Sequence, residues 1–521
     1  MSAPHPPDPA AAGTEPSAPP PGSLAPTLRH GAAISAGTLV VVQVISIVST
    51  LLLARLLSPA EVGVYAAGTV LTGFLVIASE SGLRAALVQR EGNVEDVADT
   101  VFWVTAGIGV LTSLAALAAA PLVAMVFRSE QAGQVAAVTS GMLLMYALTN
   151  VPDGLMQRRF NFKRRLIIDP SKAVAFAAVS IALAASGFGV WSLVIGNYVC
   201  MAVWLVGTWL LARWRPGHGR PSVRLWRQLA RFAFPLFIHL LVEQVRDTAE
   251  AVLVGRRLGE TSLGHYRYGR RLGMLPGLAV IEIGSYVLFP AFSRLAGEPE
   301  RLKRAFLRAL QWISAAAVPL AALVVALGEP AVVVLFGERW REAGVFLMSM
   351  AGYGLGVALQ QSGSEVIKGA GRARLLNWTS AANLLLGIGL VVVLLPFGLV
   401  GVGIAISATE LALGMLMLYL ARKVVGFSGG ELLRRLVPPV VAALAALAVI
   451  APVEHAVVQS DQAGFVAGFV LLGLQTIAFA GIYLATLRLV DPPIVAELTG
   501  AVRALVTRRR PSFTLSSRSN H

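Results

Sequence analysis

The chain has 521 residues, of which 56% are hydrophobic and only 14% are charged, and it carries a formal net charge of +15. Soluble domains carry about 25% charged residues, so this composition excludes a water-soluble globular protein and predicts an all-α polytopic membrane protein. Cys200 is the single cysteine, which excludes an internal disulfide and a cysteine-based metal cluster.

A proline-rich tail precedes a long series of apolar runs. Residues 1–28 hold nine of the 28 prolines, and we expect them to be disordered because such a composition cannot bury a core. About fourteen later runs approach the roughly 20 residues that a helix needs to cross a bilayer. These runs are 32–54, 62–83, 98–120, 134–156, 167–186, 189–212, 232–254, 264–291, 305–328, 343–367, 375–395, 399–421, 436–453 and 464–489.

Basic residues are distributed unevenly among the loops between these runs. The loops after the even-numbered runs, together with the C-terminal tail, carry most of the loop Lys and Arg. The opposite set of loops carries only six: Arg55, Arg128, Arg256, Arg257, Arg339 and Arg341. Because Lys and Arg are retained on the cytoplasmic side, both termini are predicted to be cytoplasmic. The basic excess then serves topology and contact with anionic lipids, and no nucleic-acid partner is expected.

Short motifs recur in the same order in the two halves of the chain. Arg55–Tyr65 matches Arg256–Tyr266, Pro121…Phe127 matches Pro330…Phe336, and Phe188-Gly189 matches Phe397-Gly398. Each unit contains six runs, so both halves have the same orientation, which is a parallel repeat. The predicted parts are a six-helix N-lobe (29–212), a basic cytoplasmic linker (213–231), a six-helix C-lobe (232–423), two appended helices (434–490) and a basic cytoplasmic tail (491–521).

Five segments carry a family resemblance that covers about residues 30–425. They are Leu53–Pro59, Ala85–Arg90, Leu155–Phe160, Val287–Arg294 and Leu335–Trp340. In these segments the chain resembles the polysaccharide exporter family, the oligosaccharide-lipid flippases of the multidrug/oligosaccharidyl-lipid/polysaccharide (MOP) superfamily. The resemblance implies two helical lobes around a central cavity and alternating-access export of an undecaprenyl-pyrophosphate-linked glycan across a bacterial inner membrane. It also implies membrane lipids, a glycan polymerase and export machinery as partners, with no enzyme activity.

The run 232–254 carries four charges on one helical face: Glu243, Arg246, Asp247 and Glu250. Each charge at the centre of a membrane helix costs roughly 2.5–3.5 kcal/mol, so this face is expected to meet partners or water and to mark a transport pathway. Arg246 is a candidate for the substrate, and the three carboxylates are candidates for coupling to a proton or Na⁺. The alternative is a pair of Arg246 with Glu243 or Glu250 that only fixes helix packing.

The next run begins with Arg267, Arg270 and Arg271, again on one face. Arginine binds phosphates in bidentate fashion, so these side chains are predicted to hold the pyrophosphate. The alternative is that they extend to the outer membrane interface. Lys368 is a further substrate candidate and Glu365 a further coupling candidate, and for both of them, as for Glu410, a purely structural pairing is an equal alternative. No metal site and no cofactor are predicted.

Three functions remain open at this point. The first is the flippase that the family resemblance implies. The second is a drug/cation antiporter of the same superfamily, whose cavity should be acidic or apolar, so three cavity arginines count against it. The third is a membrane-embedded glycan polymerase or ligase, which usually needs sizeable loops, whereas the outward loops here are mostly short.

Overall fold

A computed structural model of the chain describes residues 24–80, 87, 93–158, 162–283, 288–376, 378–497 and 500. Most of the predicted tail 1–28, and the tail 491–521 beyond residue 500, lie outside the described residues. All regular structure within the described ranges is helical, and the chain is an all-α polytopic membrane protein, as predicted.

The helices follow the apolar runs closely. In the first half they are α1 (Leu24–Leu56), α2 (Pro59–Glu80), α4 (Val94–Phe127), α5 (Glu130–Thr139), α6 (Gly141–Arg158), α7 (Phe162–Ala185) and α8 (Val190–Ala212). In the second half they are α9 (Val223–Leu258), α10 (Glu260–Ile283), α11 (Phe289–Arg294), α12 (Pro299–Phe336), α13 (Arg341–Ser349), α14 (Gly352–Gly369), α15 (Thr379–Leu394), α16 (Gly398–Val425), α17 (Gly429–Val453) and α18 (Phe465–Val490). The run 134–156 is divided between α5 and α6, and the run 343–367 between α13 and α14.

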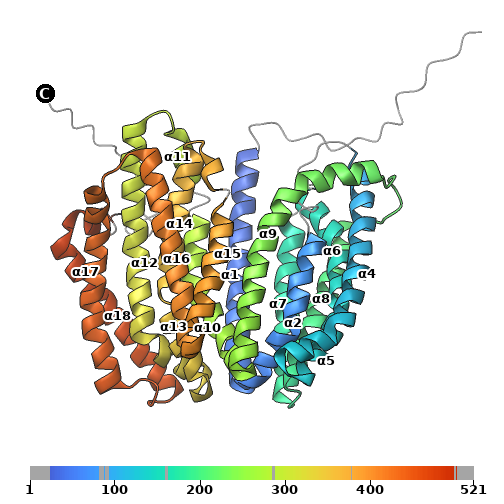
Figure 1. Cartoon of the computed structure of the whole chain (residues 1–521), viewed down its shortest axis with the longest axis horizontal. Helices are drawn as coiled ribbons and strands as arrows, with labels where there is room; N and C mark the ends of the chain where they lie inside the picture. Colours follow the sequence, from blue (N-terminus) through green and yellow to red (C-terminus); the bar gives the residue numbers. More distant parts are fainter. Residues whose placement is uncertain are drawn as a thin grey trace, which may run out of the picture.

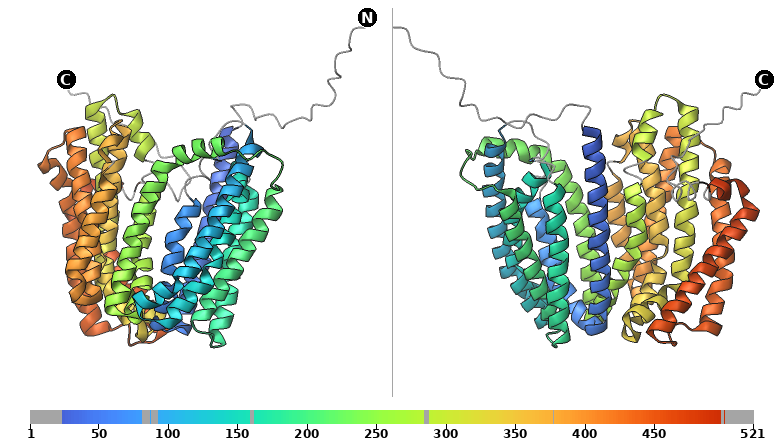
Figure 2. Two further views of the ribbon diagram at one scale, coloured as in Figure 1. Left: turned by 45° about the vertical axis from the view of Figure 1, so that its right-hand side comes forward. Right: turned by 180° about the vertical axis from the view of Figure 1, so that it is seen from behind.

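The helices form two groups that stand side by side. Figure 1 shows α2 and α4–α8 in one group and α10–α16 in the other, with α1 and α9 between them and α17–α18 at the outer edge of the second group. Figure 2 shows α1 standing between the two groups when the molecule is seen from behind. A single buried apolar cluster includes Leu53 of α1, Val64 of α2 and Phe346 of α13, so the two groups share a core.

Ten helical stretches within the described residues are long and apolar enough to cross a membrane, and Val40–Leu56 is a shorter apolar helix. α9 and α10 do not belong to this set, because both carry several charges. They are also the helices that the sequence singles out for a transport pathway. The number of spans and the repeat of two six-helix lobes stay predictions.

α9 is bent. Figure 1 shows its first turns lying crosswise at the end of the molecule, whereas the rest of the helix runs alongside the other long helices. Pro235 lies inside α9, where it removes a main-chain hydrogen bond and its ring displaces the preceding turn. The segment 213–231, predicted as a linker, is therefore helical from Val223 onward.

Candidate functional site

A cavity of about 610 Å³ lies between the two helix groups, next to α2, α6, α8, α9 and α10. The first group contributes Thr69, Gly73 and Asn197, and α9 contributes Gln244 and Asp247. Three arginines of α10 complete the polar part of the lining: Arg267, Arg270 and Arg271. The cavity is therefore bordered by both groups and is cationic on its α10 side.

The cavity is closed at one end by a tight crossing of α2 and α10. A Cβ atom on Gly63 would lie 1.8 Å from the main-chain oxygen of Glu260, and one on Gly264 would lie 1.9 Å from that of Pro59. Only glycine permits two main chains to approach this closely. Gly63 and Gly264 occupy matching positions in the motifs Arg55–Tyr65 and Arg256–Tyr266, and each lies against the other's helix. We call this end of the molecule the closed side.

Two further contacts join the helix groups at the closed side. The indole Nε1 of Trp340, which is fully buried, donates to the carbonyl oxygen of Ala54 at 2.7 Å. The guanidinium of Arg55 donates to the carbonyl oxygens of Val334 and Leu335 at 2.6 and 2.9 Å. These donors satisfy carbonyl groups at the C-terminal ends of α1 and α12, which have no partner within their own helices.

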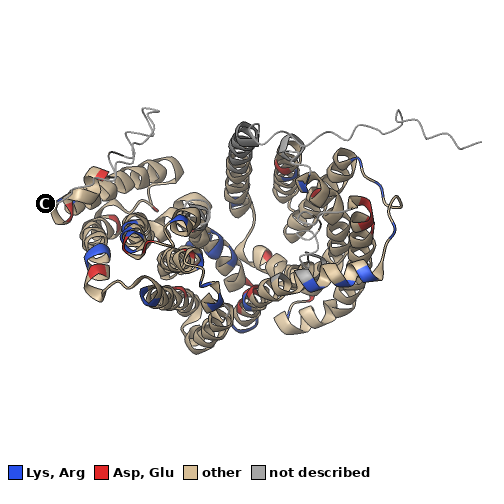
Figure 3. Cartoon of the chain, turned by 90° about the horizontal axis from the view of Figure 1, so that it is seen from above, with Lys and Arg blue, Asp and Glu red and all other residues tan. Residues whose placement is uncertain are grey.

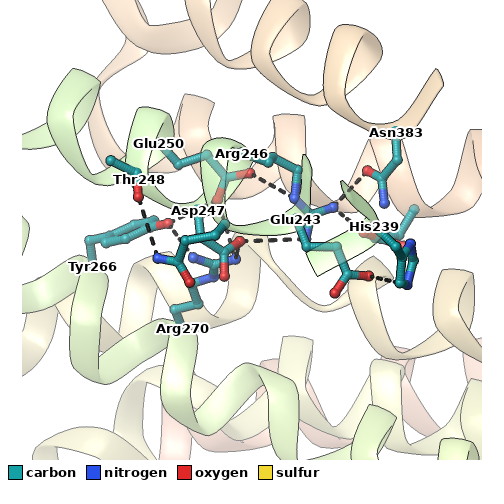
Figure 4. Close-up of polar contacts among 11 residues, drawn as sticks. His239, Glu243, Arg246, Asp247, Thr248, Glu250, Tyr266, Arg270 and Asn383 are labelled. Atoms are coloured by element: carbon teal, nitrogen blue, oxygen red, sulfur yellow. Dashed lines mark hydrogen bonds and ion pairs between the residues drawn. The ribbon is translucent and has the colours of Figure 1, made fainter. Parts of the chain in front are cut away.

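Three charges of α9, Arg246, Asp247 and Glu250, belong to a network of ion pairs and hydrogen bonds that extends across four helices (Figure 4). Arg246 donates through Nη1 to Asn383 of α15 at 2.6 Å and to Glu410 of α16 at 3.1 Å. Its Nε lies 3.7 Å from an oxygen of Glu250. Glu250 and Glu410 are almost completely buried, and charges in such places need partners of opposite sign.

Arg270 of α10 is the second cation of this network. Its Nη2 lies 2.6 Å from Asp247 and 3.4 Å from Glu250, and its Nη1 donates to the Tyr266 hydroxyl at 2.9 Å. That hydroxyl in turn donates to Glu250 at 2.9 Å. We define the α9 network as Arg246, Asp247, Glu250, Arg270 and Glu410. It has three carboxylates and two guanidinium groups, so with all members ionised it carries one surplus negative charge.

Arg267 and Arg271 differ from Arg270 in that neither pairs with a carboxylate among the described residues. The guanidinium of Arg267 lies over the ring of Tyr65, 5.5 Å from its centroid, and Arg271 donates to the hydroxyl of Ser46. Both side chains are exposed and both line the cavity. They are the cations of this site that retain the capacity to bind an anionic ligand.

The remaining predicted site residues lie outside the cavity lining. Glu243 is exposed and lies 3.5 Å from His239. On α14, the buried Glu365 accepts hydrogen bonds from Lys368 and Gln361, both at 2.7 Å. The structure therefore gives Glu365 and Lys368 a mutual pairing and does not bring them to the cavity.

Some members of the site were not found from the sequence. Asn383, Tyr266 and Tyr65 are uncharged, and although Tyr65 and Tyr266 stand at matching ends of the repeated motif, that match did not identify them as site residues. Glu410 stood out only as a single charge in an apolar run, and its partner Arg246 could not be assigned without the fold. Among the described residues, no group of three His, Cys, Asp or Glu side chains is arranged to hold a metal ion.

Two groups of membrane helices around a charged cavity that is closed at one end are an arrangement typical of membrane transporters. The chain belongs to the polysaccharide biosynthesis protein family, whose model matches residues 52–344. This membership confirms the polysaccharide family expected from the sequence.

Similar proteins agree with this assignment. The succinoglycan biosynthesis transport protein ExoT of Rhizobium meliloti is 28% identical over 330 residues, which span 63% of this chain and 66% of ExoT. The teichuronic acid biosynthesis protein TuaB of Bacillus subtilis is 23% identical over 71% of this chain and 77% of TuaB.

Solved structures share the fold. The lipid II flippase MurJ in an inward closed conformation has a TM-score of 0.69 at 13% identity, covering 89% of this chain and 99% of MurJ. An inward-facing multidrug resistance MATE family transporter of the MOP superfamily has a TM-score of 0.62 at 16% identity, covering 74% of this chain and 94% of that transporter. At these identities the likeness shows the fold alone.

Proposed function

We propose that this chain is a flippase that moves a lipid-linked oligosaccharide from the cytoplasmic to the outer leaflet of a bacterial inner membrane, by alternating access. The observation that carries the proposal is the pair of exposed arginines, Arg267 and Arg271, in a cavity between two helix groups. The names of the similar proteins, a succinoglycan transport protein and a lipid II flippase, support export of a surface polysaccharide precursor.

The chemistry of the cavity suits an undecaprenyl-pyrophosphate headgroup. A pyrophosphate presents several oxygens to guanidinium forks, and charge-assisted bonds of this kind are about twice as strong as neutral ones. Arg267 and Arg271 supply such forks, while Arg270 is occupied by Asp247 and Glu250. A cavity for a cationic drug should be acidic or apolar instead, so the two free arginines count against the antiporter alternative.

The proposed architecture has fourteen spans. Helices α1–α8 form the N-lobe and α9–α16 the C-lobe, related by a parallel repeat. α17 and α18 are appended to the outer face of α12, with which they share a buried apolar cluster. In this arrangement the Gly63–Gly264 crossing lies near the axis of the repeat, where the two lobes would separate when the closed side opens.

A topology experiment tests the orientation, which rests on the uneven distribution of Lys and Arg in the loops. With Cys200 replaced by Ala, single cysteines at Glu130 and Arg339, both exposed at the closed side, are expected to react with an impermeant thiol reagent in intact cells. Cysteines at Gly297 and Glu300, exposed at the opposite end, should react only after lysis. The reverse pattern would place the termini outside and contradict the direction of export.

A flipping assay tests the substrate site. In proteoliposomes the double variant Arg267→Gln/Arg271→Gln is expected to reduce flipping of a fluorescent undecaprenyl-pyrophosphate-linked glycan roughly ten- to a hundredfold, the range of one lost charge-assisted contact. Arg256→Gln/Arg257→Gln is the matched control, because these two arginines are exposed at the end of α9 and do not line the cavity. Equal flipping by the cavity variant and the control would exclude the proposed binding site.

A further inference from the structure

The first turns of α9 present three arginines on one face. Arg224, Arg227 and Arg231 are spaced i, i+3 and i+7 and are all exposed, and within the described residues they form no ion pair. Leu225 and Leu229 lie on the other side of the helix and pack into a buried cluster of the first helix group. Figure 3 shows the blue segments spaced along this crosswise stretch. We call the three arginines the α9 platform.

The surface over the α9 platform is open and is lined by the three arginines with Val223 and Gln228, all from the first turns of α9. A headgroup can therefore approach the guanidinium groups directly from outside the protein.

The platform is attached firmly to the first helix group. In the loop before it, the main-chain N–H groups of Gly217 and Gly219 donate to the buried carboxylate of Asp99 at 3.0 and 2.6 Å. The N–H of Ser222 donates to the hydroxyl of Thr100 at 3.2 Å. A Cβ atom on Gly219 would lie 2.4 Å from the carbonyl oxygen of Glu95, so the loop also packs closely on α4. A site held in this way is pre-organised and loses little conformational entropy when it binds.

A second arginine series, at the same end of the molecule, forms ion pairs with nearby carboxylates. Arg301, Arg304 and Arg308 of α12 have the same i, i+3, i+7 spacing and are also exposed. Arg301 pairs with Glu298 at 2.7 Å, Arg308 pairs with Glu497 at 3.0 Å, and Arg304 donates to a main-chain carbonyl. The platform arginines lack such partners in the described part of the chain, although their burial and spacing are alike.

We propose that the α9 platform captures the pyrophosphate of the lipid-linked glycan at the cytoplasmic leaflet before the substrate enters the cavity. The inference rests on the proposed flippase function. Side chains three or four residues apart on a helix lie about 5–6 Å apart, which lets neighbouring guanidinium forks bind the two linked phosphates at the same time. An ordinary anionic phospholipid offers one phosphate and engages one fork.

The same helix leads from the platform to the cavity. Arg231 is thirteen residues before Gln244, which lines the cavity, so at 1.5 Å per residue the helix between them is about 20 Å long, and the bend at Pro235 makes the direct distance no greater. A headgroup released from the platform therefore has a short path along α9 to Arg267 and Arg271. The platform raises the local concentration of substrate at the entrance and takes no part in the translocation step.

The test measures flipping of a fluorescent undecaprenyl-pyrophosphate-linked glycan by the full chain in phosphatidylcholine vesicles, as a function of substrate concentration. The variant Arg224→Gln/Arg227→Gln/Arg231→Gln is expected to raise KM about tenfold, with the rate at saturation within about twofold of the parent. Arg301→Gln/Arg304→Gln/Arg308→Gln is the matched control, and its KM should stay unchanged. The same series is repeated in vesicles rich in phosphatidylglycerol, where the difference in KM should persist.

Three outcomes would overturn the capture site while leaving the flippase function in place: an unchanged KM in the platform variant, an equal rise in KM in the control variant, or loss of the difference in phosphatidylglycerol vesicles. The last result would identify the platform as a general contact for anionic lipids. By contrast, absence of flipping by the parent protein would overturn the proposed function itself. The two failures are therefore distinguishable in one set of measurements.

Discussion

Gly63→Ala is expected to open the closed side of the cavity and to reduce flipping by about ten- to a hundredfold. The added methyl group would lie 1.8 Å from a main-chain oxygen of Glu260, which cannot move without shifting α10. Overpacking costs about 1–3 kcal/mol, and a cost of roughly 1.4–2.7 kcal/mol within that range lowers the population of the closed state by this factor. Gly264→Ala should act in the same way, because its Cβ would lie 1.9 Å from the oxygen of Pro59.

The matched control is Gly73→Ala on the same helix. There the nearest atom to the new Cβ is the side-chain nitrogen of Gln244, at 3.8 Å, which is an ordinary contact. Both substitutions make the same gain in helix propensity. A difference in flipping between the two variants therefore arises from the crossing of α2 and α10 and not from a change in the stability of α2.

Accessibility of a single cysteine provides the measurement. With Cys200 replaced by Ala, a cysteine at Thr69, in the cavity lining, should be protected from an impermeant reagent outside intact cells. The protection should be lost in the Gly63→Ala protein and retained in the Gly73→Ala protein. If Gly63→Ala flips substrate normally and leaves Thr69→Cys protected, the crossing does not control the cavity.

The sequence predicted which helix face carries the charge, but it did not predict the partners of those charges. The i, i+3, i+4, i+7 spacing places Glu243, Arg246, Asp247 and Glu250 on one side of α9 wherever that helix lies. Asn383 and Glu410 reach Arg246 from helices that are far away in the chain. Which helices neighbour α9 depends on the packing of whole helix groups, and no local pattern contains that information.

Neighbouring arginines of α10 illustrate the same limit. Arg270 and Arg271 are adjacent in the sequence, and both were predicted to bind the pyrophosphate. A step of one residue turns a helix by about 100°, so Arg270 is directed toward Asp247 and Glu250 while Arg271 reaches Ser46 of α1. From the sequence alone, Arg270 and Arg271 are equal candidates for binding the pyrophosphate. Their different partners follow only from the positions of α9 and α1.

The matched motifs predict a repeat, but they do not predict which parts of the two copies contact each other. Matching Gly63 with Gly264 indicated a duplicated unit, because the two glycines occupy the same position in related motifs. That the two copies contact each other follows only from the placement of α2 against α10. The count of spans stays a prediction: the runs 232–254 and 264–291 are long enough to cross a bilayer, but the charged helices α9 and α10 that contain them are not among the ten apolar stretches of the described residues.

Asp247→Asn is expected to abolish the response of flipping to an imposed pH gradient. The α9 network carries one surplus negative charge, and protonation of one carboxylate makes it neutral. Asp247 is the member that both lines the cavity and retains considerable exposure, 42% of its side chain, so it has access to protons from the cavity. The coupling proton would then bind to Asp247 in one conformation of the two lobes and leave it in the other.

Flipping in proteoliposomes should accelerate when a pH gradient of the correct sign is imposed on the parent protein, and the steady-state distribution of the glycan between the leaflets should shift by up to about tenfold for each pH unit when one proton is coupled. Asp247→Asn should keep the downhill rate, because its amide oxygen still accepts a hydrogen bond from Arg270, but its rate should no longer depend on the gradient. Glu365→Gln is the matched control: its carboxylate is buried against Lys368 outside the cavity, so the gradient response should persist. A parent protein that responds to a Na⁺ gradient alone would assign Na⁺ to the same carboxylates, whereas indifference to both gradients would leave the concentration gradient of the glycan as the driving force and contradict the coupling role of Asp247.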